Sequence, residues 1–248
     1  MIWAPSVPAH FIGSFKIPLI IAGTALTHAI YTPPNPPPAP HETSKYKEDK
    51  LGVVAPRTAF LLTKAIYGAF ASCESAVIIA NAFPSPISTA ILSRLIRPSY
   101  SAAAVRLTAT TTMGWALLCA IGLIRIACYR TLGRFYTFQL SILEDHHLVT
   151  TGPYAIVRHP SYSVGLLIIP GTLLSVFSTG SWCREAGWLD TLAGKVLAAV
   201  WIAYIIQFLA IVCVVRVRQE DAALRKQFPQ EWERYAQRTP YRLVPFIY

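Results

Sequence analysis

The sequence predicts an all-α polytopic membrane protein, with about five transmembrane helices, a polar loop and an amphipathic C-terminal helix. Two observations lead to this fold class. Hydrophobic residues make up 54% of the 248 residues and charged residues only 14%, which is far from the balance of soluble domains. The hydrophobic residues also gather in runs close to the roughly 20 residues that a helix needs to cross a bilayer.

Five runs are candidate membrane spans. They cover residues 11–31, 58–83, 106–129, 162–177 and 196–215. The first carries a single charge, Lys16, and the second contains Lys64 and Glu74, whereas the fifth has no charged residue. The fourth needs a short extension to reach the length of a span.

Two segments between the runs read differently. Residues 32–57 form a proline-rich and then charged linker, in which neither helix nor strand is expected. Residues 84–105 hold three prolines around an apolar stretch that is too short to cross a bilayer, which predicts a re-entrant or interfacial helix. Lys and Arg concentrate on the side that receives the linker, the loop after residue 129 and the tail, so that side is predicted to face the cytosol.

The charge distribution limits the classes of binding partner, and the spacing of the cysteines indicates their role. Lys and Arg number 22 against 12 Asp and Glu, but they lie between the apolar runs rather than in one cluster. This distribution favours the lipid bilayer, anionic lipid or a negatively charged small ligand, and we expect no nucleic acid partner. The five cysteines have neither metal-ligand nor disulfide-framework spacing, so they are predicted to be reduced filling residues.

A polar excursion separates the third and fourth runs and ends in GPYAIVRHPSY, residues 152–162. Pro160 suits the first position of a helix, where a missing N–H costs nothing. A residue before proline is held out of helical conformation, so the ring of His159 is expected to face the excursion. The free N–H groups of the helix start suit a carboxylate. The alternative is an interfacial His-Pro cap, with Tyr154 and Tyr162 in an aromatic belt.

A second polar cluster follows the fifth run. Arg216 and Glu220 are one turn apart on a continuing helix, so they are predicted to pair with each other or to hold a zwitterionic ligand. Arg218 is interpreted as an anchor that reaches the membrane surface. Beyond it, apolar residues keep helical spacing and predict an amphipathic lid or floor. They are Leu224, Phe228, Trp232 and Tyr235.

These residues together resemble the isoprenylcysteine carboxyl methyltransferase family. The resemblance is carried by LVTTGPYAIVRHPSYSVG, by Arg216 with EDAAL after it, and by FPQEWERYAQRTPYRLVPFI, and it spans roughly residues 139–247. An isolated RHPxY is less specific, because phospholipid methyltransferases look similar there. Two departures concern substrate entry: a longer FSTGSWCREAGWLD loop follows the fourth run, and Phe228-Pro229 stands where the family has Phe-Gly.

The resemblance implies a pocket for S-adenosyl-L-methionine, built by the excursion, the start of the fourth helix and the tail. Arg216 matches the substrate-binding arginine of the family, and no metal site is expected, because His146, His147 and His159 lack HExxH-like spacing. The matching cofactor-binding residues are Gln139, His146, His147, Leu148, Val149, Tyr154, His159, Pro160, Ser161, Tyr162 and Glu220.

The activity that the resemblance implies is methyl esterification of the C-terminal carboxylate of a prenylated cysteine, in a CaaX-type protein or a prenylcysteine. The chain then divides into membrane helices at 1–129 and a catalytic region at 130–248, in the endoplasmic reticulum with its site facing the cytosol. The prenyl chain is expected to enter between the third to fifth runs. Alternatives are methyl transfer to a phospholipid amine or a lipophilic small acid, and a non-catalytic membrane scaffold.

Overall fold

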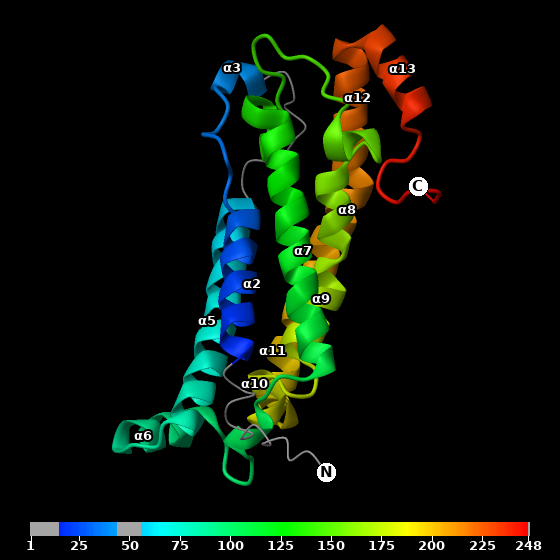
Figure 1. The fold of residues 1–248 in the computed structure, drawn as a ribbon. Coiled ribbons are helices and arrows are strands. Elements are labelled where there is room, and N and C mark those ends of the chain that lie inside the picture. Colours follow the sequence, from blue (N-terminus) through cyan, green and yellow to red (C-terminus); the bar gives the residue numbers. More distant parts are fainter. Residues whose placement is uncertain (1–14, 44–55, 248) are drawn as a thin grey trace, which may run out of the picture. The chain divides into compact units, whose positions relative to one another are not determined.

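The computed structural model describes residues 15–43 and 56–247, and within these ranges it is helical with no strand (Figure 1). The long helices follow the hydrophobic runs. In chain order the principal helices are α2 (Lys16–Ile30), α3 (Pro40–Thr43), α5 (Pro56–Ala82), α6 (Pro86–Leu95), α7 (Ala109–Leu132), α8 (Pro160–Leu166), α9 (Ile168–Val176), α10 (Trp182–Glu185), α11 (Leu192–Ile211), α12 (Val217–Gln227) and α13 (Pro229–Arg238).

Three of these helical stretches are long and apolar enough to cross a membrane. They are Thr58–Ala82, Ala109–Phe135 and Leu192–Gln227, and they contain most of the second, third and fifth expected runs. Lys16–Ile30 and Pro160–Val176 are apolar but shorter. An integral membrane protein is therefore supported. The count of five spans stays a prediction, and residues 11–14 of the first run lie outside the described part.

The linker contains one helical turn that was not expected. α3 begins at a proline, whose fixed backbone suits a helix start. The carboxylate of Glu42 accepts a hydrogen bond from the backbone N–H of Ala39 at 2.8 Å, which satisfies one of the free donors at this end. The prediction of no helix is therefore wrong at this turn, while residues 44–55 of the linker lie outside the described ranges.

The proline-bounded segment after the second run forms the short helix α6, which leaves the end of α5 at an angle (Figure 1). Ser85 caps α6 by accepting the backbone N–H of Ser88 at 3.0 Å, and Pro86 occupies its first turn. Ten residues make a helix about 15 Å long, half the thickness of a bilayer core. Its placement in an interfacial or re-entrant position stays a prediction.

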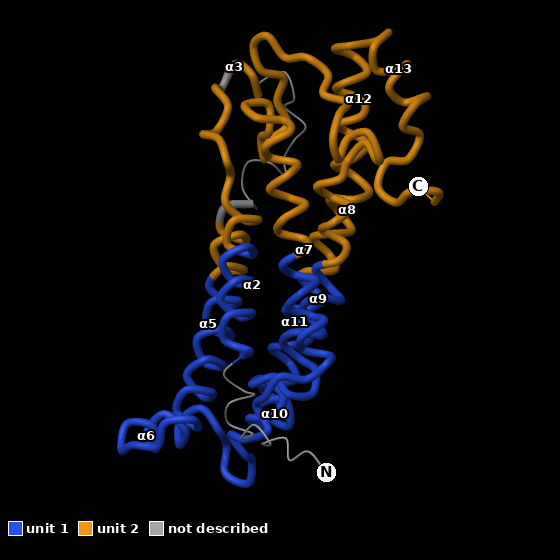
Figure 2. Tube along the Cα trace, viewed as in Figure 1, with its two compact units in different colours: residues 1–27, 65–119, 168–204 blue, residues 28–64, 120–167, 205–248 orange. Residues whose placement is uncertain are grey.

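The chain divides into two compact units, and the long helices contribute to both of them (Figure 2). Unit 1 consists of residues 1–27, 65–119 and 168–204, and unit 2 of residues 28–64, 120–167 and 205–248. The division into regions before and after residue 129 that the sequence suggested stays a prediction. Nearly all the residues implicated by the motifs fall in unit 2.

Unit 1 is held together by aromatic rings and by close helix contacts. Trp201 of α11 packs edge-on against Tyr67 and stacks on Phe70, with ring centroids 5.4 and 5.5 Å apart. Gly114 of α7 lies directly against α9, because a Cβ on it would stand 2.3 Å from the backbone nitrogen of Ser175. A small residue is required where two helix backbones approach this closely.

The Gly114→Ala variant is therefore expected to be destabilised by about 1–3 kcal/mol, since a methyl group there forces α7 and α9 apart. Gly68→Ala in α5 is the matched control, because a Cβ there meets no atom within 4 Å. Alanine gains up to about 1 kcal/mol over glycine in a helix, so this variant is expected to be neutral or stabilised. Thermal unfolding of both proteins in the same detergent measures the difference. Equal melting temperatures would contradict the close contact.

Candidate functional site

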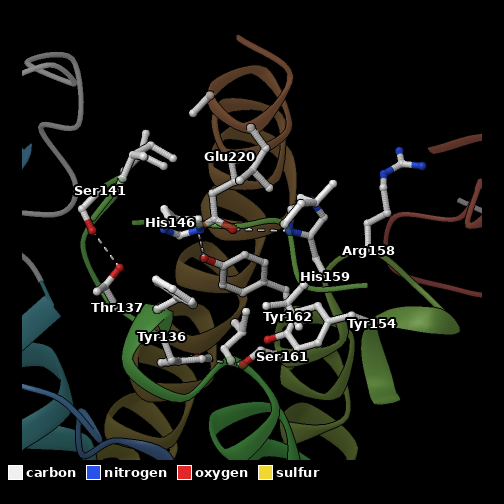
Figure 3. Close-up of a pocket in the computed structure, with 18 of the residues that line it drawn as sticks. Tyr136, Thr137, Ser141, His146, Tyr154, Arg158, His159, Ser161, Tyr162 and Glu220 are labelled. Atoms are coloured by element: carbon white, nitrogen blue, oxygen red, sulfur yellow. Dashed lines mark hydrogen bonds and ion pairs between the residues drawn. The ribbon is translucent and has the colours of Figure 1, made fainter. Parts of the chain in front are cut away.

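Unit 2 contains an open pocket between the excursion, the start of α8 and the C-terminal helices (Figure 3). Its empty space, including the part open to solvent, is about 850 Å³. The lining residues are Leu132, Phe135, Tyr136, Thr137, Gln139, Leu140, Ser141, Ile142, His146, Leu148, Val149, Tyr154, Arg158, His159, Ser161, Tyr162, Glu220, Ala223, Leu224 and Tyr235.

Most of the residues proposed from the sequence line this pocket, but three do not. The ring of His147 packs edge-on against Phe135, with centroids 4.7 Å apart. Pro160 is the buried first residue of α8. Arg216 stands one hydrogen bond away from the pocket, through its contact with Glu220.

Arg216 ends a π-helical turn, Val212–Arg216, inserted between α11 and α12. Such turns are uncommon and often lie at functional sites. The guanidinium is buried; its Nε donates to Glu220 Oε1 at 2.9 Å, and a terminal nitrogen donates to the carbonyl of Phe138 at 3.3 Å. The Arg216–Glu220 pair that the spacing predicted is present, whereas the π turn was not predicted.

Glu220 is the acidic centre of the pocket, and the side chains of Tyr162 and His159 point at it (Figure 3), while Arg216 contacts it from outside the pocket. Tyr162 donates its hydroxyl proton to Oε1 at 2.5 Å, and Arg216 contacts the same oxygen. Nδ1 of His159 lies 3.3 Å from Oε2. Glu220 thus presents a fixed negative charge, oriented before any ligand arrives.

His159 has a non-helical backbone, with φ of −126° and ψ of 61°, as expected for a residue before proline. Its ring is buried between two carboxylates, because Nε2 lies 2.9 Å from Oδ1 of Asp221 and Nδ1 faces Glu220. Burial lowers the pKa of His159, but the hydrogen bonds and charges of Asp221 and Glu220 more than offset this, so its pKa is raised above 6.5. Only an imidazolium donates from both nitrogens.

The start of α8 has fewer free donors than the sequence suggested. The backbone N–H groups of Tyr162 and Ser163 both donate to the carbonyl of His159. The hydroxyl of Ser161 is 2.8 Å from that of Tyr136, and its carbonyl accepts a hydrogen bond from Arg125 at 3.0 Å. This end of the helix is therefore fixed chiefly by contacts within the protein.

His146 contributes a neutral, partly unsatisfied ring to the pocket. It packs against Phe135 and Phe228, with centroids 4.5 and 5.8 Å apart. Burial, and then the nearby charges of His147 and Arg134, lower its pKa to about 4. Its Nδ1 is buried and has no hydrogen-bond partner among the described residues, which leaves one polar position available to a ligand.

Among the side chains that sequence reasoning missed are four that shape the pocket or its support. Arg158 directly precedes His159, and Asp221 directly follows Glu220. Their position next to a proposed site residue was therefore the signal in the sequence that could have identified them. Nothing in the sequence marked Tyr136 as a site residue except its position in the polar excursion. Tyr235 was assigned only to the tail stripe, yet it lines the pocket and donates its hydroxyl proton to the carbonyl of Tyr154 at 2.8 Å.

Comparisons with known proteins agree with the resemblance read from the sequence. Residues 113–182 match the model of the isoprenylcysteine carboxyl methyltransferase (ICMT) family. The chain is 28% identical over 190 residues to protein-S-isoprenylcysteine O-methyltransferase B of Arabidopsis thaliana, covering 76% of this chain and 86% of that protein. The resemblance to this family is thus confirmed.

A second relative carries a different name. The chain is 31% identical over 125 residues to the cobalt-zinc-cadmium resistance protein CzcN of Cupriavidus metallidurans, covering 50% of this chain and 48% of that protein. In residues 15–43 and 56–247, no group of three or more His, Cys, Asp or Glu side chains is placed to hold a metal ion. No solved structure matches the chain.

Proposed function

We propose that this chain, which resembles the isoprenylcysteine carboxyl methyltransferase family, transfers a methyl group from S-adenosyl-L-methionine to the C-terminal carboxylate of a prenylated cysteine. One observation carries the proposal: Glu220 meets the His159 corner in one pocket and is hydrogen-bonded to Arg216 behind it, at the end of an apolar helix. By resemblance, the substrate is a prenylated CaaX-type protein or a prenylcysteine. The protein then lies in the endoplasmic reticulum membrane with its pocket facing the cytosol.

The residues present fit the methyl donor. Glu220 is an oriented carboxylate for a cationic amino-acid end, and the neutral ring of His146 offers a free Nδ1 to a flat base. Tyrosine rings and the apolar side chains of Leu148 and Val149 also line the pocket. When bound, the donor supplies an electrophilic methyl group on a sulfonium.

Arg216 is proposed to hold the acceptor. Its guanidinium is always charged and has a planar fork that matches a carboxylate. A C-terminal carboxylate is ionised at neutral pH, so the reaction requires no general base. The task of Arg216 is then to hold the carboxylate in line with the methyl group, which is the main contribution of positioning to such a transfer.

The histidines favour a carboxylate acceptor over an amine. An amine must lose a proton, so it needs a base near the methyl group. His146, with a pKa of about 4, is too weak a base for this role near neutral pH. Both nitrogens of His159 face carboxylates, and His147 does not line the pocket. None of these three histidines thus offers the base that phospholipid amine methylation needs.

The test supplies labelled S-adenosyl-L-methionine to the purified full-length protein with three acceptors in separate reactions: N-acetyl-S-farnesylcysteine, its methyl ester, and phosphatidylethanolamine. Base-labile label with the free acid alone is the expected result. Label on phosphatidylethanolamine would replace the proposal by amine methylation. Absence of label in all three, together with no binding of S-adenosylhomocysteine, would indicate a scaffold.

Arg216→Lys is expected to raise the KM for the farnesylcysteine acceptor about tenfold, because a lysine cannot make the two parallel contacts of a guanidinium. A tenfold change corresponds to about 1.4 kcal/mol, the scale of one charge-assisted hydrogen bond. Arg225→Lys is the matched control, since Arg225 lies in α12, the helix that follows Arg216, but is exposed. Initial rates against acceptor concentration give both values. An unchanged KM for Arg216→Lys would exclude this role.

A further inference from the structure

The proposed function leaves one buried charge beside the pocket without a role. Asp221 follows Glu220 in α12 and is only 6% exposed. Its carboxylate accepts from three side chains: His159 Nε2 at 2.9 Å, Arg158 at 3.3 Å and Arg242 Nε at 3.0 Å. A buried carboxylate is stable only where such partners offset the loss of water. Asp221 therefore joins the RHPSY motif to the end of the chain.

The same motif, together with Ser163 directly after it, fastens a stretch of the tail, residues 239–243, which we call the C-terminal strap. Arg158 is the main link, and its side chain extends away from the pocket while that of His159 points into it (Figure 3). Five hydrogen bonds make the connection: Arg158 to the carbonyls of Thr239 and Pro240 at 2.8 Å each, the backbone N–H of Arg158 to Tyr241 at 2.9 Å, the backbone N–H of His159 to Arg242 at 2.9 Å, and the hydroxyl of Ser163 to Leu243 at 2.6 Å.

We propose that Asp221 is a positioning residue for the donor site, which keeps His159 as an imidazolium facing Glu220 and fastens the C-terminal strap behind it. Asp221 does not line the pocket, so it acts through His159. The proposal rests on the proposed function, because it assumes that the donor binds at Glu220.

The charges around His159 explain why Asp221 matters. Both carboxylates belong to α12 and contact the ring nitrogens directly. The cationic neighbours contact these carboxylates instead: Arg216 reaches Glu220, while Arg158 and Arg242 reach Asp221. Tyr162 of α8 stacks on the ring, with centroids 5.9 Å apart, and donates its hydroxyl proton to Glu220.

Removing the charge of Asp221 therefore removes the strongest support for the proton on His159. Its hydrogen bond is the first of the effects that raise the pKa of His159, after burial, which lowers it. A neutral ring carries a single N–H and satisfies one of its two partners. Once His159 loses its proton, Glu220 loses its charge-assisted contact with the ring and keeps only those with Tyr162 and Arg216, so the donor site weakens.

The experiment compares S-adenosylhomocysteine binding to the full-length wild type and to Asp221→Asn, by titration calorimetry between about pH 6 and 8, the range in which a histidine titrates. A raised pKa means that the wild-type imidazolium persists below it and is lost as pH rises through it. The affinity of Asp221→Asn for S-adenosylhomocysteine is expected to be about tenfold lower than that of the wild type near pH 8. Near pH 6 it is expected to recover toward the wild-type value. The midpoint of this decline is expected at least about one pH unit below that of the wild type.

Two further variants separate positioning from folding. Glu233→Gln removes the exposed ion pair with Arg225 and is expected to bind as the wild type does at every pH. Asp221→Glu keeps the charge, so its midpoint is expected to stay near the wild-type value even if its affinity falls. If Asp221→Asn folds poorly, Asp221→Glu and the pH profile of the acceptor KM still test the positioning role.

The possible failures are distinguishable. If the wild type does not bind S-adenosylhomocysteine, the proposed function fails and this inference with it. If the wild type binds but Asp221→Asn weakens binding equally at all pH values, or only lowers the melting temperature, the positioning role is overturned and the proposed function stands. A midpoint that moves equally in Asp221→Glu would also overturn it, because the charge would then not be the cause.

Discussion

Glu220→Gln is expected to reduce kcat/KM for methyl transfer by at least about 100-fold and to abolish most of the affinity for S-adenosylhomocysteine. Glu220 is the oriented anion of the pocket, and Tyr162, Arg216 and His159 all contact it. The neutral amide loses a charge-assisted contact to the donor, worth about 1.5–3 kcal/mol. It also releases Arg216 from its partner, so the acceptor is held less well.

Two measurements separate these effects. Calorimetric titration with S-adenosylhomocysteine reports the donor site alone, whereas the KM for the acceptor at saturating donor reports the placement of Arg216. Glu231→Gln in the first turn of α13 is the matched control, because Glu231 is exposed. Donor affinity equal to wild type in Glu220→Gln would show that the donor binds elsewhere, and the role assigned to Glu220 would be wrong.

The helices that could be predicted were those with a strong length signal. Uninterrupted apolar runs located the stretches Thr58–Ala82, Ala109–Phe135 and Leu192–Gln227. The single turn α3 could not be found in this way, because four residues in a proline-rich segment depend on one cap, made by Glu42. The π turn at Val212–Arg216 could not be predicted either. One extra residue in a turn does not change the pattern of a uniformly apolar sequence, so hydrophobic periodicity cannot detect it.

The site was predictable where its residues are neighbours in the chain or share a resemblance. Helical spacing predicted the contact of Arg216 with Glu220. The approach of His159 to Glu220, across about sixty residues, followed from the resemblance alone, and the structure places Nδ1 3.3 Å from the carboxylate. The role of Asp221 could not be predicted, because its partners include the tail residue Arg242 and no periodicity links the two.

Irregular backbone explains the remaining differences. His146 and His147 are adjacent, but only His146 lines the pocket, because the excursion has no regular period that fixes which side chain turns inward. The helix start at Pro160 was located correctly, but the carbonyl of His159 uses two of its N–H groups. The sequence indicates where such a helix begins. It does not indicate which of the backbone N–H groups at that end already donate hydrogen bonds within the protein.

A buried ion pair in unit 1 carries the second large prediction. Lys16 of α2 is fully buried, and its Nζ lies 2.6 Å from Glu74 Oε1 of α5. The same nitrogen donates to the carbonyls of Gly180 at 2.8 Å and Arg106 at 3.2 Å. The other oxygen of Glu74 accepts the backbone N–H of Trp182 at 2.8 Å. Lys16, the charge in the first apolar run, and Glu74, the acidic residue in the second, thus compensate each other.

Lys16→Met is expected to destabilise the protein by about 3–5 kcal/mol, because it leaves the carboxylate of Glu74 buried without its cation. The double variant Lys16→Met with Glu74→Gln is expected to recover most of this loss, since glutamine carries no charge and still accepts the N–H of Trp182. Asp145→Asn, which breaks the exposed pair with Arg134, is the control and is expected to change stability by less than about 1 kcal/mol. Thermal unfolding in detergent compares the four proteins. A double variant no more stable than Lys16→Met would mean that the hydrogen bonds of Lys16 to Gly180 and Arg106, rather than charge compensation, hold these segments together.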